Sequence, residues 1–287
     1  MIQFQLLLTE HGLDPSEVLV LRHRPTEPEL RQMLPSYAAE APEMFDAYQR
    51  YQNPGVERQM LKSKFVAAFI GHRPGSAVFV GIFENRGNKR VTAQQRGACP
   101  EFRRLMELGC TDTDNDCLQF NLHQTSILAH LKGKLVIQWP GLERSWNRWG
   151  NSKSGYPIAA ILEDSLLIEA MPHWRNLAVS WKALRELPRS WQESLRQWRG
   201  IYYIFDSSRK VGYVGSAYGK DNMPGRWLGY ASSGHGGNKK LKSCDPEHFQ
   251  FSVLELLGHD TPKDEVVERE SSWKKRLHTR EYGLNDN

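Results

Sequence analysis

The feature that most constrains this chain is a tyrosine-rich pair of short β segments bounded by glycines, GIYYIFDSSRKVGYVG, at 200–215. Two runs of strand-forming residues flank the turn-rich pentapeptide DSSRK, a pattern typical of a β-hairpin. In such a hairpin, Tyr202 and Tyr213 fall on neighbouring antiparallel strands. Gly200 and Gly215 stand at strand ends, where a backbone often passes close to another group. We therefore expect a hairpin with two adjacent tyrosines.

The segment that follows the hairpin predicts a helix, a third strand and a last helix. If RWLGY is helical, Arg226 and Tyr230 are four residues apart and share one face. HFQFSVLELL, at 248–257, has the composition of a strand. The last helix is expected to begin at Thr261, because Thr, Pro and an early Asp follow each other in the order that favours a helix start.

One side chain of that last helix stands where an apolar residue is expected. Val266, Glu270, Trp273 and Leu277 fall on one stripe at helical spacing. Glu270 is thus a carboxylate on the face that should be buried, and it needs a cation, a metal or strong hydrogen bonds there. An ion pair with Arg or Lys and a metal-binding role both remain open. Glu268 points elsewhere, and we expect it to be solvated.

The motifs of this segment resemble those of a known family. GIY at 200–202, YVG at 213–215, Arg226, Glu270 and Asn285 occur in the order and spacing of the GIY-YIG nuclease family. The blocks YVGSA, RW and VVERESSWKKRL are especially similar to the nuclease domain of phage intron homing endonucleases. Each motif is short, and it is the agreement of five in register that makes the resemblance specific.

The resemblance implies a small α+β nuclease domain, a three-stranded antiparallel sheet with flanking helices. It implies that Glu270 binds one divalent metal, Mg²⁺ or Mn²⁺, and that Arg226 steadies the charge on the scissile phosphate. It also implies that Tyr202 is the general base for the attacking water and that Tyr213 orients this water. Asn285 is expected to support the site by hydrogen bonding.

Elementary chemistry is consistent with these roles. A phosphodiester transition state gathers negative charge on oxygen, which a guanidinium and a metal stabilise. Tyrosine is an unusual base because its reference pKa is near 10, so nearby positive charge must lower it or the proton must move through a relay. Where the family often has His, four residues after the arginine, this chain has Tyr230. We expect Tyr230 in the site as a hydrogen-bond donor or second base, with simple packing as the alternative.

The first 190 residues are expected to form a separate DNA-recognition domain, 1–190, that ends in a helical linker, and the nuclease domain is expected at 198–287. Helical spacing dominates 1–55, and strands are expected within 64–84 and 134–164. This pattern predicts a mixed α/β domain. Its strands resemble PUA-like or EVE-like modules, which read modified bases in other nucleases.

Several side chains are candidates for contact with DNA. Indoles and guanidiniums gather in LVIQWPGLERSWNRWG, and such groups can stack on a flipped base, although packing in the core is the alternative for the tryptophans. Lys239 and Lys240 stand in the Gly/Lys-rich loop GHGGNKKLK, where a phosphate contact and a solvated loop are both open. These candidates are Trp139, Arg144, Trp146, Arg148, Trp149, Lys239 and Lys240.

Charge and cysteine content narrow the setting. The net charge is +5, and the excess is local, because His173–Arg199 holds six Arg and Lys against two Glu. A basic segment of this kind suits a polyanion. The four cysteines form no CxxC pair, and no apolar run approaches the roughly 18 residues that a membrane span needs. We expect a cytoplasmic protein with reduced thiols and without a signal peptide.

These observations predict a metal-dependent endodeoxyribonuclease that acts on double-stranded DNA. Because the expected recognition domain precedes the nuclease domain, whereas it follows it in the homing enzymes, a restriction-type role in phage defence is favoured. The recognition domain would read a plain sequence or a modified base. A structure-selective repair or recombination nuclease and a catalytically silent DNA-binding protein are the alternatives. A single active site per chain leaves a homodimer and sequential nicking both open.

Overall fold

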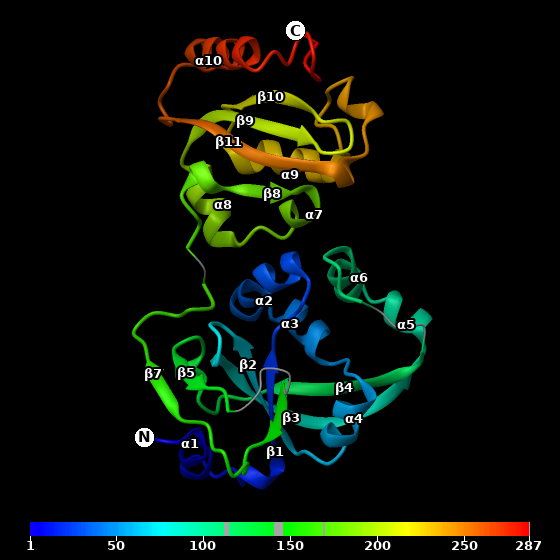
Figure 1. Cartoon of the computed structure of the whole chain (residues 1–287), viewed down its shortest axis with the longest axis vertical. Helices are drawn as coiled ribbons and strands as arrows, with labels where there is room; N and C mark the ends of the chain where they lie inside the picture. The colour runs from blue at the N-terminus through cyan, green and yellow to red at the C-terminus, as the bar shows by residue number, and fades with distance from the viewer. Residues whose placement is uncertain (112–114, 141–145, 169, 287) are drawn as a thin grey trace. The chain divides into compact units, whose positions relative to one another are not determined.

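A computed structural model describes residues 1–111, 115–140, 146–168 and 170–286. The chain forms two compact units, Met1–Glu169 (unit 1) and Ala170–Asn287 (unit 2). The division therefore falls about twenty residues before the end of the predicted recognition domain. Both units combine strands with helices, so the expected α+β class is confirmed (Figure 1).

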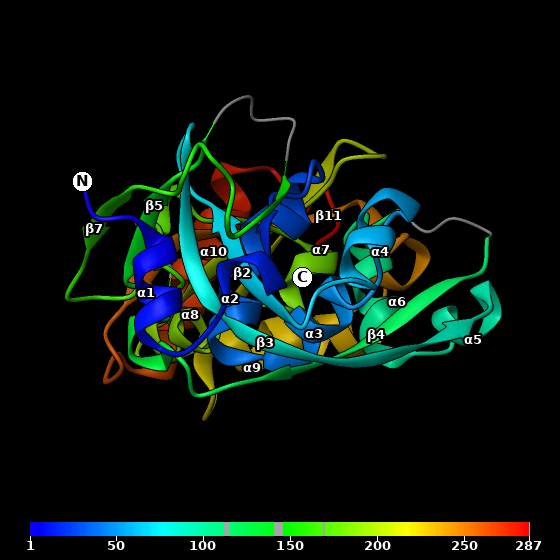
Figure 2. The ribbon, with the colours of Figure 1, turned by 90° about the horizontal axis from the view of Figure 1, so that it is seen from below.

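The described residues of unit 1 form seven strands. They are β1 (Val18–His23), β2 (Phe65–Gly71), β3 (Ser76–Val91), β4 (Cys117–Gln124), β5 (Leu135–Gln138), β6 (Asn147–Trp149) and β7 (Ile158–Ile161). The sheet order is β6-β1-β2-β3-β5-β7, with β4 also paired to β3. Only the described pair β1–β2 is parallel, so the sheet is mixed. Strand β3 is long and curved (Figure 2). The PUA-like architecture stays a prediction.

Helices cover this sheet. They are α1 (Phe4–Glu10), α2 (Pro28–Glu40), α3 (Pro42–Gln49), α4 (Pro54–Met60), α5 (Ala93–Gly97) and α6 (Pro100–Glu107). Four of them start with proline, whose fixed φ suits the first helical position. Val18 and Val20 of β1 pack with Phe4 of α1 in the main core. Successive side chains alternate between faces, and His23 lies on the other face, with its ring 5.4 Å from that of Phe45 of α3.

Within residues 170–286, unit 2 has four antiparallel strands, β8 (Ala178–Ser180), β9 (Arg199–Asp206), β10 (Val211–Ala217) and β11 (Phe249–Leu257). Their order is β10-β9-β11-β8. The sequence predicted strands β9, β10 and β11. The fourth, β8, comes from the segment that was expected to be a helical linker. The accompanying helices are α7 (Trp181–Leu184), α8 (Arg189–Arg196), α9 (Asn222–Ser233) and α10 (Lys263–Arg276).

The sheet of unit 2 has a helix on each face, α9 on one and α10 on the other (Figure 1). Ile201 and Val214 pack against Val266 of α10. On the opposite face, Phe251 contacts Trp227 of α9, with ring centroids 5.8 Å apart. The parity of a residue on β9 or β10 therefore decides which helix it meets. Across the described residues of both units, no helix is long and apolar enough to cross a membrane.

Candidate active site

Strands β9 and β10 bring the two predicted tyrosines onto one face of the hairpin. Tyr202 stands opposite Gly215, and Tyr213 stands opposite Ile204. Because side chains alternate along a strand, both rings point toward α9. A Cβ on Gly215 would lie 2.5 Å from Cζ of Tyr202, so any larger residue there would displace the ring. The predicted hairpin is confirmed, and Gly215 is part of what positions Tyr202.

Helix α9 adds Arg226 and Tyr230 to these tyrosines. Tyr230 is fully buried, and its hydroxyl oxygen lies 3.0 Å from that of Tyr202. The ring centroids of Tyr213 and Tyr230 are 6.4 Å apart. The guanidinium carbon of Arg226 lies 5.5 Å from the centroid of the Tyr230 ring, which is a cation–π contact, while the Arg226 side chain stays exposed. The structure thus joins these four predicted residues in one cluster.

Burial controls the protonation of this cluster. Loss of hydration raises the pKa of Tyr202, Tyr213 and Tyr230 above the ordinary value near 10. The positive charge of Arg226 acts in the opposite direction on the pKa of Tyr202 and Tyr213, but it does not outweigh burial. At neutral pH the phenols are therefore protonated and serve as hydrogen-bond donors. A base role for Tyr202 needs added positive charge or a proton relay.

Glu270 reaches the site from helix α10, on the opposite face of the sheet. Its Oε1 lies 2.8 Å from Nζ of Lys274, one turn further along, and its side chain is 16% exposed. Its other carboxylate oxygen accepts a hydrogen bond from the Ser216 hydroxyl of β10. Of the two roles left open by the sequence, the structure shows the ion pair, and the metal role stays a prediction. Sequence reasoning missed Lys274, although its spacing from Glu270 is that of a helical ion pair.

These groups meet in a cleft of about 550 Å³ at the edge strand β10. Tyr213 and Arg226 enter it from the α9 face, and Glu270 and Lys274 enter it from α10. Arg280 brings a third cationic side chain, so that three cations face one carboxylate among the described lining residues. Such an excess of positive charge suits a phosphate group. The other lining residues are Ser216, Tyr218, Gly219, Val267 and Ser271.

The donor set of this cleft fits a hydrated divalent cation. The described residues contain no group of three or more His, Cys, Asp or Glu side chains that could enclose a metal. Mg²⁺ nevertheless often binds through one or two carboxylates and completes its shell with waters and substrate phosphate oxygens. Glu270 can supply that carboxylate and Ser216 a neutral oxygen beside it. The cation would share Glu270 with Lys274.

Asn285 is buried and lies along the free edge of strand β10. Its Oδ1 accepts a hydrogen bond from the Val214 N–H at 2.9 Å, and its Nδ2 donates one to the Val214 carbonyl at 2.8 Å. Val214 directly follows Tyr213, so Asn285 fixes the backbone that carries this tyrosine. It does not line the cleft. Its side chain therefore acts through the backbone of β10.

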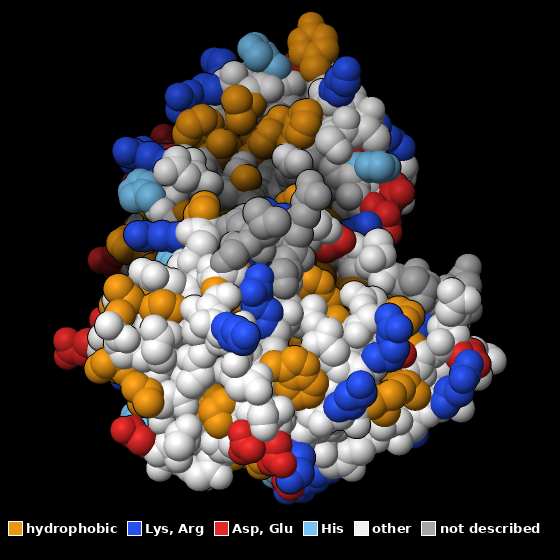
Figure 3. Space-filling view, turned by 60° about the horizontal axis from the view of Figure 1, so that its bottom comes forward, with side chains coloured by type: hydrophobic (Ala, Val, Ile, Leu, Met, Phe, Trp, Pro, Cys, Tyr) orange, Lys and Arg blue, Asp and Glu red, His pale blue; other side chains and the backbone are white. Residues whose placement is uncertain are grey.

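The two lysines proposed for DNA contact have different surroundings. Lys240 donates a hydrogen bond to the Asn285 carbonyl at 2.8 Å and pairs with Asp286 at 3.4 Å, so it anchors the C-terminal segment. Lys239 is exposed. On the face that Figure 3 shows, Lys and Arg side chains lie singly or in small groups among other residue types.

The candidates for DNA contact in unit 1 are spread over different environments. Trp139 is only 4% exposed and belongs to the main core, so it has no free ring face for a base, and that expectation is corrected. The cause is its position directly after β5, where it points into the apolar side of the sheet. Arg148 and Trp149 lie half-buried on β6, and Trp146 is half-buried and lines a pocket. Arg144 lies outside the described residues.

Comparison with known proteins gave matches only among solved structures. No family model and no curated protein matches the chain. One matching structure is the catalytic domain of homing endonuclease I-TevI, with 29% identity over 31% of this chain and 98% of that domain, at a TM-score of 0.27. Another is an alanine-substituted mutant of the catalytic domain of intron endonuclease I-TevI, with 28% identity over 31% of this chain and 94% of that one, at a TM-score of 0.26. Both matches span nearly a whole catalytic domain and less than a third of this chain.

Proposed function

We propose that this protein is a divalent-metal-dependent endonuclease that hydrolyses phosphodiester bonds in double-stranded DNA. The observation that carries the proposal is the convergence of Tyr213, Arg226 and Glu270 on one cationic cleft, although the first two come from one face of the sheet and the third from the other. Phosphodiester hydrolysis needs a hydrogen-bonding group for water, a fixed cation for the developing charge and an oxygen ligand for a metal. The cleft holds one of each.

The cationic side chains bind and orient the substrate. Arg226, Lys274 and Arg280 place three positive charges around the cleft, and a phosphate there is held by charge-assisted hydrogen bonds. Arg226 can stabilise the negative charge that develops on a non-bridging oxygen in the transition state, because its guanidinium is held over the Tyr230 ring. Lys274 and the Ser216 hydroxyl hold the Glu270 carboxylate in one orientation.

The tyrosines contribute to positioning the attacking water. When bound at Glu270, a divalent cation supplies Lewis-acid stabilisation of the phosphoryl oxygens and lowers the pKa of water. Tyr213 lines the cleft and can hydrogen-bond to that water, whereas Tyr202 is fully buried and does not line it. The Tyr230 hydroxyl contacts that of Tyr202, so the two buried phenols hold each other in position beside Tyr213. We assign to Tyr213 the role of orienting the water, whose proton leaves to bulk solvent through the open cleft, and to Tyr230 and Tyr202 the role of positioning Tyr213.

We further propose a restriction-type role, in which unit 1 selects the DNA and unit 2 cuts it. Unit 1 has its own sheet and core, as a separate recognition domain requires. It also offers a pocket with aromatic and cationic lining, which suits the reading of a base. In this arrangement the substrate is duplex DNA that bears a particular sequence or a modified base.

A cleavage assay with a matched carboxylate control tests the nuclease proposal. Wild type, Glu270→Gln and Glu268→Gln are compared with and without Mg²⁺ on unmodified plasmid, cytosine-modified phage DNA and a branched oligonucleotide. Glu268 lies exposed on the same helix, so its substitution controls for the loss of one charge, and urea unfolding of Glu270→Gln controls for the loss of the Lys274 ion pair. We expect metal-dependent cutting that falls by about 10²-fold or more in Glu270→Gln, comparable to the loss of one transition-state stabiliser, and stays unchanged in Glu268→Gln.

The substrate that is cut distinguishes the biological roles. Preference for the modified phage DNA supports modification-dependent restriction, and cutting of the plasmid at fixed positions supports sequence-specific restriction. Preference for the branched oligonucleotide would replace restriction with repair or recombination. If Glu270→Gln cuts as well as wild type, the assigned metal carboxylate is wrong. If wild type cuts none of the three and also leaves a pool of random-sequence duplexes intact, the nuclease proposal fails in favour of a DNA-binding protein.

A further inference from the structure

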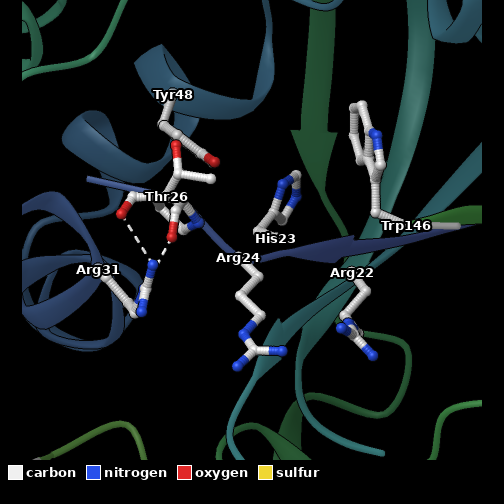
Figure 4. Close-up of a pocket in the computed structure, with 8 residues that line it drawn as sticks. Arg22, His23, Arg24, Thr26, Arg31, Tyr48 and Trp146 are labelled. Carbon is white, nitrogen blue, oxygen red and sulfur yellow. Dashed lines mark hydrogen bonds between the residues drawn. The ribbon is translucent and has the colours of Figure 1, made fainter. Parts of the chain in front are cut away.

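A hollow of about 500 Å³ lies in unit 1 at the end of strand β1. Figure 4 shows that its side chains come from two directions around the strand. His23 points to the side where Tyr48 and Trp146 lie, whereas Arg22 and Arg24 project to the other side. This division follows from the alternation of side chains along β1. The hollow therefore has an aromatic wall and a cationic wall.

The aromatic wall is shared with a second hollow. Tyr48 of α3 and His23 meet edge to face, with ring centroids 5.4 Å apart. Trp146, which directly precedes β6, completes the wall and is half-buried. The same three residues also line an adjoining hollow of about 390 Å³. Flat rings that border an open volume in this way provide surfaces on which a planar ligand can stack.

His23 gives this wall a polar group that is set up for a ligand. It is 2% exposed, and its Nε2 has no hydrogen-bond partner among the described residues. Burial lowers the pKa of His23 to about 3, so the ring is neutral at physiological pH. A neutral imidazole nitrogen can donate or accept one hydrogen bond, depending on its tautomer. A buried polar atom of this kind is normally satisfied by a partner, and here a ligand can provide it.

The cationic wall carries three arginines. Arg31 donates hydrogen bonds of 2.8 Å to the carbonyls of Pro25 and Thr26, which fixes the loop after β1 (Figure 4). Arg22 is buried, and Arg24 is exposed at the rim. No acidic side chain is found among the described lining residues of this hollow. An anionic group is therefore attracted to this wall.

We propose that this hollow binds a nucleotide extruded from duplex DNA. The base stacks on Trp146 and Tyr48 and presents an edge to His23, while an adjoining phosphate faces Arg24 at the rim. A base, a sugar and a phosphate match a pocket that is aromatic at one side and cationic at the other, and extruded bases are read by stacking together with hydrogen bonds to their edges. This inference deepens the proposed function, on which it rests, by assigning the recognition step to a site in unit 1.

The test compares two duplexes that differ only in one base. One carries a single unpaired nucleotide as a bulge, which lowers the cost of extrusion, and the other carries an abasic site at the same bulge. Binding of the full chain is measured by fluorescence anisotropy in EDTA, so that cutting does not interfere. We expect the base-bearing bulge to bind about fivefold tighter or more, the lower end for stacking of one base on an aromatic side chain. A third arm measures binding of free deoxynucleoside monophosphates.

Two sets of variants, one of tryptophans and one of arginines, separate the walls of the pocket. Trp146→Ala should bring the affinity ratio of the two duplexes to about one, whereas Trp146→Phe should keep part of the preference. Trp198→Ala is the control, because Trp198 is exposed and lies outside the pocket, and it should leave the ratio unchanged. Arg24→Ala should weaken binding of both duplexes alike and lower the salt dependence by about one phosphate contact, while the exposed Arg73→Ala should not. Circular dichroism melting confirms that each variant is folded.

Three outcomes would overturn the proposal of a nucleotide pocket. A wild-type ratio near one, or a ratio that survives Trp146→Ala in a folded protein, overturns the proposal. Saturable binding of free nucleotides without preference for the base-bearing bulge also overturns it, because the ligand would then be a free nucleotide. The outcome is independent of cutting. A missing base preference with intact metal-dependent cleavage refutes the pocket alone, and a clear base preference without cleavage refutes the nuclease proposal alone.

Discussion

The ion pair between Glu270 and Lys274 should make a measurable contribution to the stability of unit 2. Lys274→Met replaces the ammonium group with an apolar chain of similar length and leaves the Glu270 carboxylate with the Ser216 hydroxyl. Glu270→Gln removes the charge from the other partner. The double variant removes both charges, and it should be more stable than the sum of the single effects predicts.

The geometry sets the expected size. At 2.8 Å and an effective dielectric constant of about 20, two unit charges attract by about 6 kcal/mol, from which the cost of removing both from water must be subtracted. Loss of one partner of a buried pair costs about 3–5 kcal/mol. Because the Glu270 side chain keeps 16% of its exposure, the low end applies, about 3 kcal/mol for Lys274→Met. The coupling energy in the double-mutant cycle should be about 2 kcal/mol.

Urea unfolding followed through hydrogen exchange of the β10 amides measures these changes in the free energy of unfolding for unit 2 alone, without interference from unit 1. Lys275→Met is the control, because Lys275 is exposed on the same helix and should change stability by less than about 0.5 kcal/mol. If Lys274→Met is no more destabilising than this control, or if the single effects simply add, the pair does not hold Glu270 in place.

Three further predictions concern buried groups. Asn285→Ala should lower the free energy of unfolding in urea by about 2 kcal/mol, because two hydrogen bonds to Val214 are lost. Asn285→Asp should lower it further, because it places an oxygen against the Val214 carbonyl. Equal stability of the Asp variant and wild type would contradict this prediction. The depressed pKa of His23, about 3, contributes stability that is present above its ordinary value of 6.5 and is lost as pH falls from 6.5 to about 3. His23→Leu should therefore reduce the pH dependence of the unfolding free energy of unit 1 in this range by about 1.4 kcal/mol per pH unit. Identical slopes of the unfolding free energy against pH would refute this prediction. The raised pKa of Tyr230 contributes stability that is present below its ordinary value near 10 and is lost above it. Tyr230→Phe should therefore lower the slope of the unfolding free energy against pH, measured above pH 10, by about 1.4 kcal/mol per pH unit. An unchanged slope would show that Tyr230 ionises freely in the folded state.

Local patterns anticipated the elements that local chemistry determines. The hairpin of β9 and β10 was predicted because the turn and the glycines stand within a few residues of the strands. Strand β1 was missed, since its six residues lie in a stretch with helix-like spacing, and a short apolar run fits a buried strand or helix equally well. Strand β8 has three residues and no pattern of its own. It exists because Val179 pairs with Phe251, a contact across the unit.

The same distinction explains what was and was not found at the sites. Tyr213, Arg226 and Glu270 were chosen from motifs, and the structure brings them to one cleft. The hydrogen bond from Ser216 to Glu270 could not be read in advance, because it depends on helix α10 lying across β10. The pocket of unit 1 was also out of reach. It combines β1, α3 and the residue before β6, which only the folded sheet brings together.

The short strand β8 has a practical consequence for work on the nuclease unit alone. It pairs with one side of β11 at Gln250, Phe251 and Ser252, while β9 pairs with the other side. A fragment that starts at residue 198 would lose β8 and leave that stretch of β11 as an open sheet edge. Unprotected edges invite pairing between molecules, so such a fragment should self-associate and precipitate. A fragment that starts at Ala170 keeps the protecting strand and should remain monodisperse.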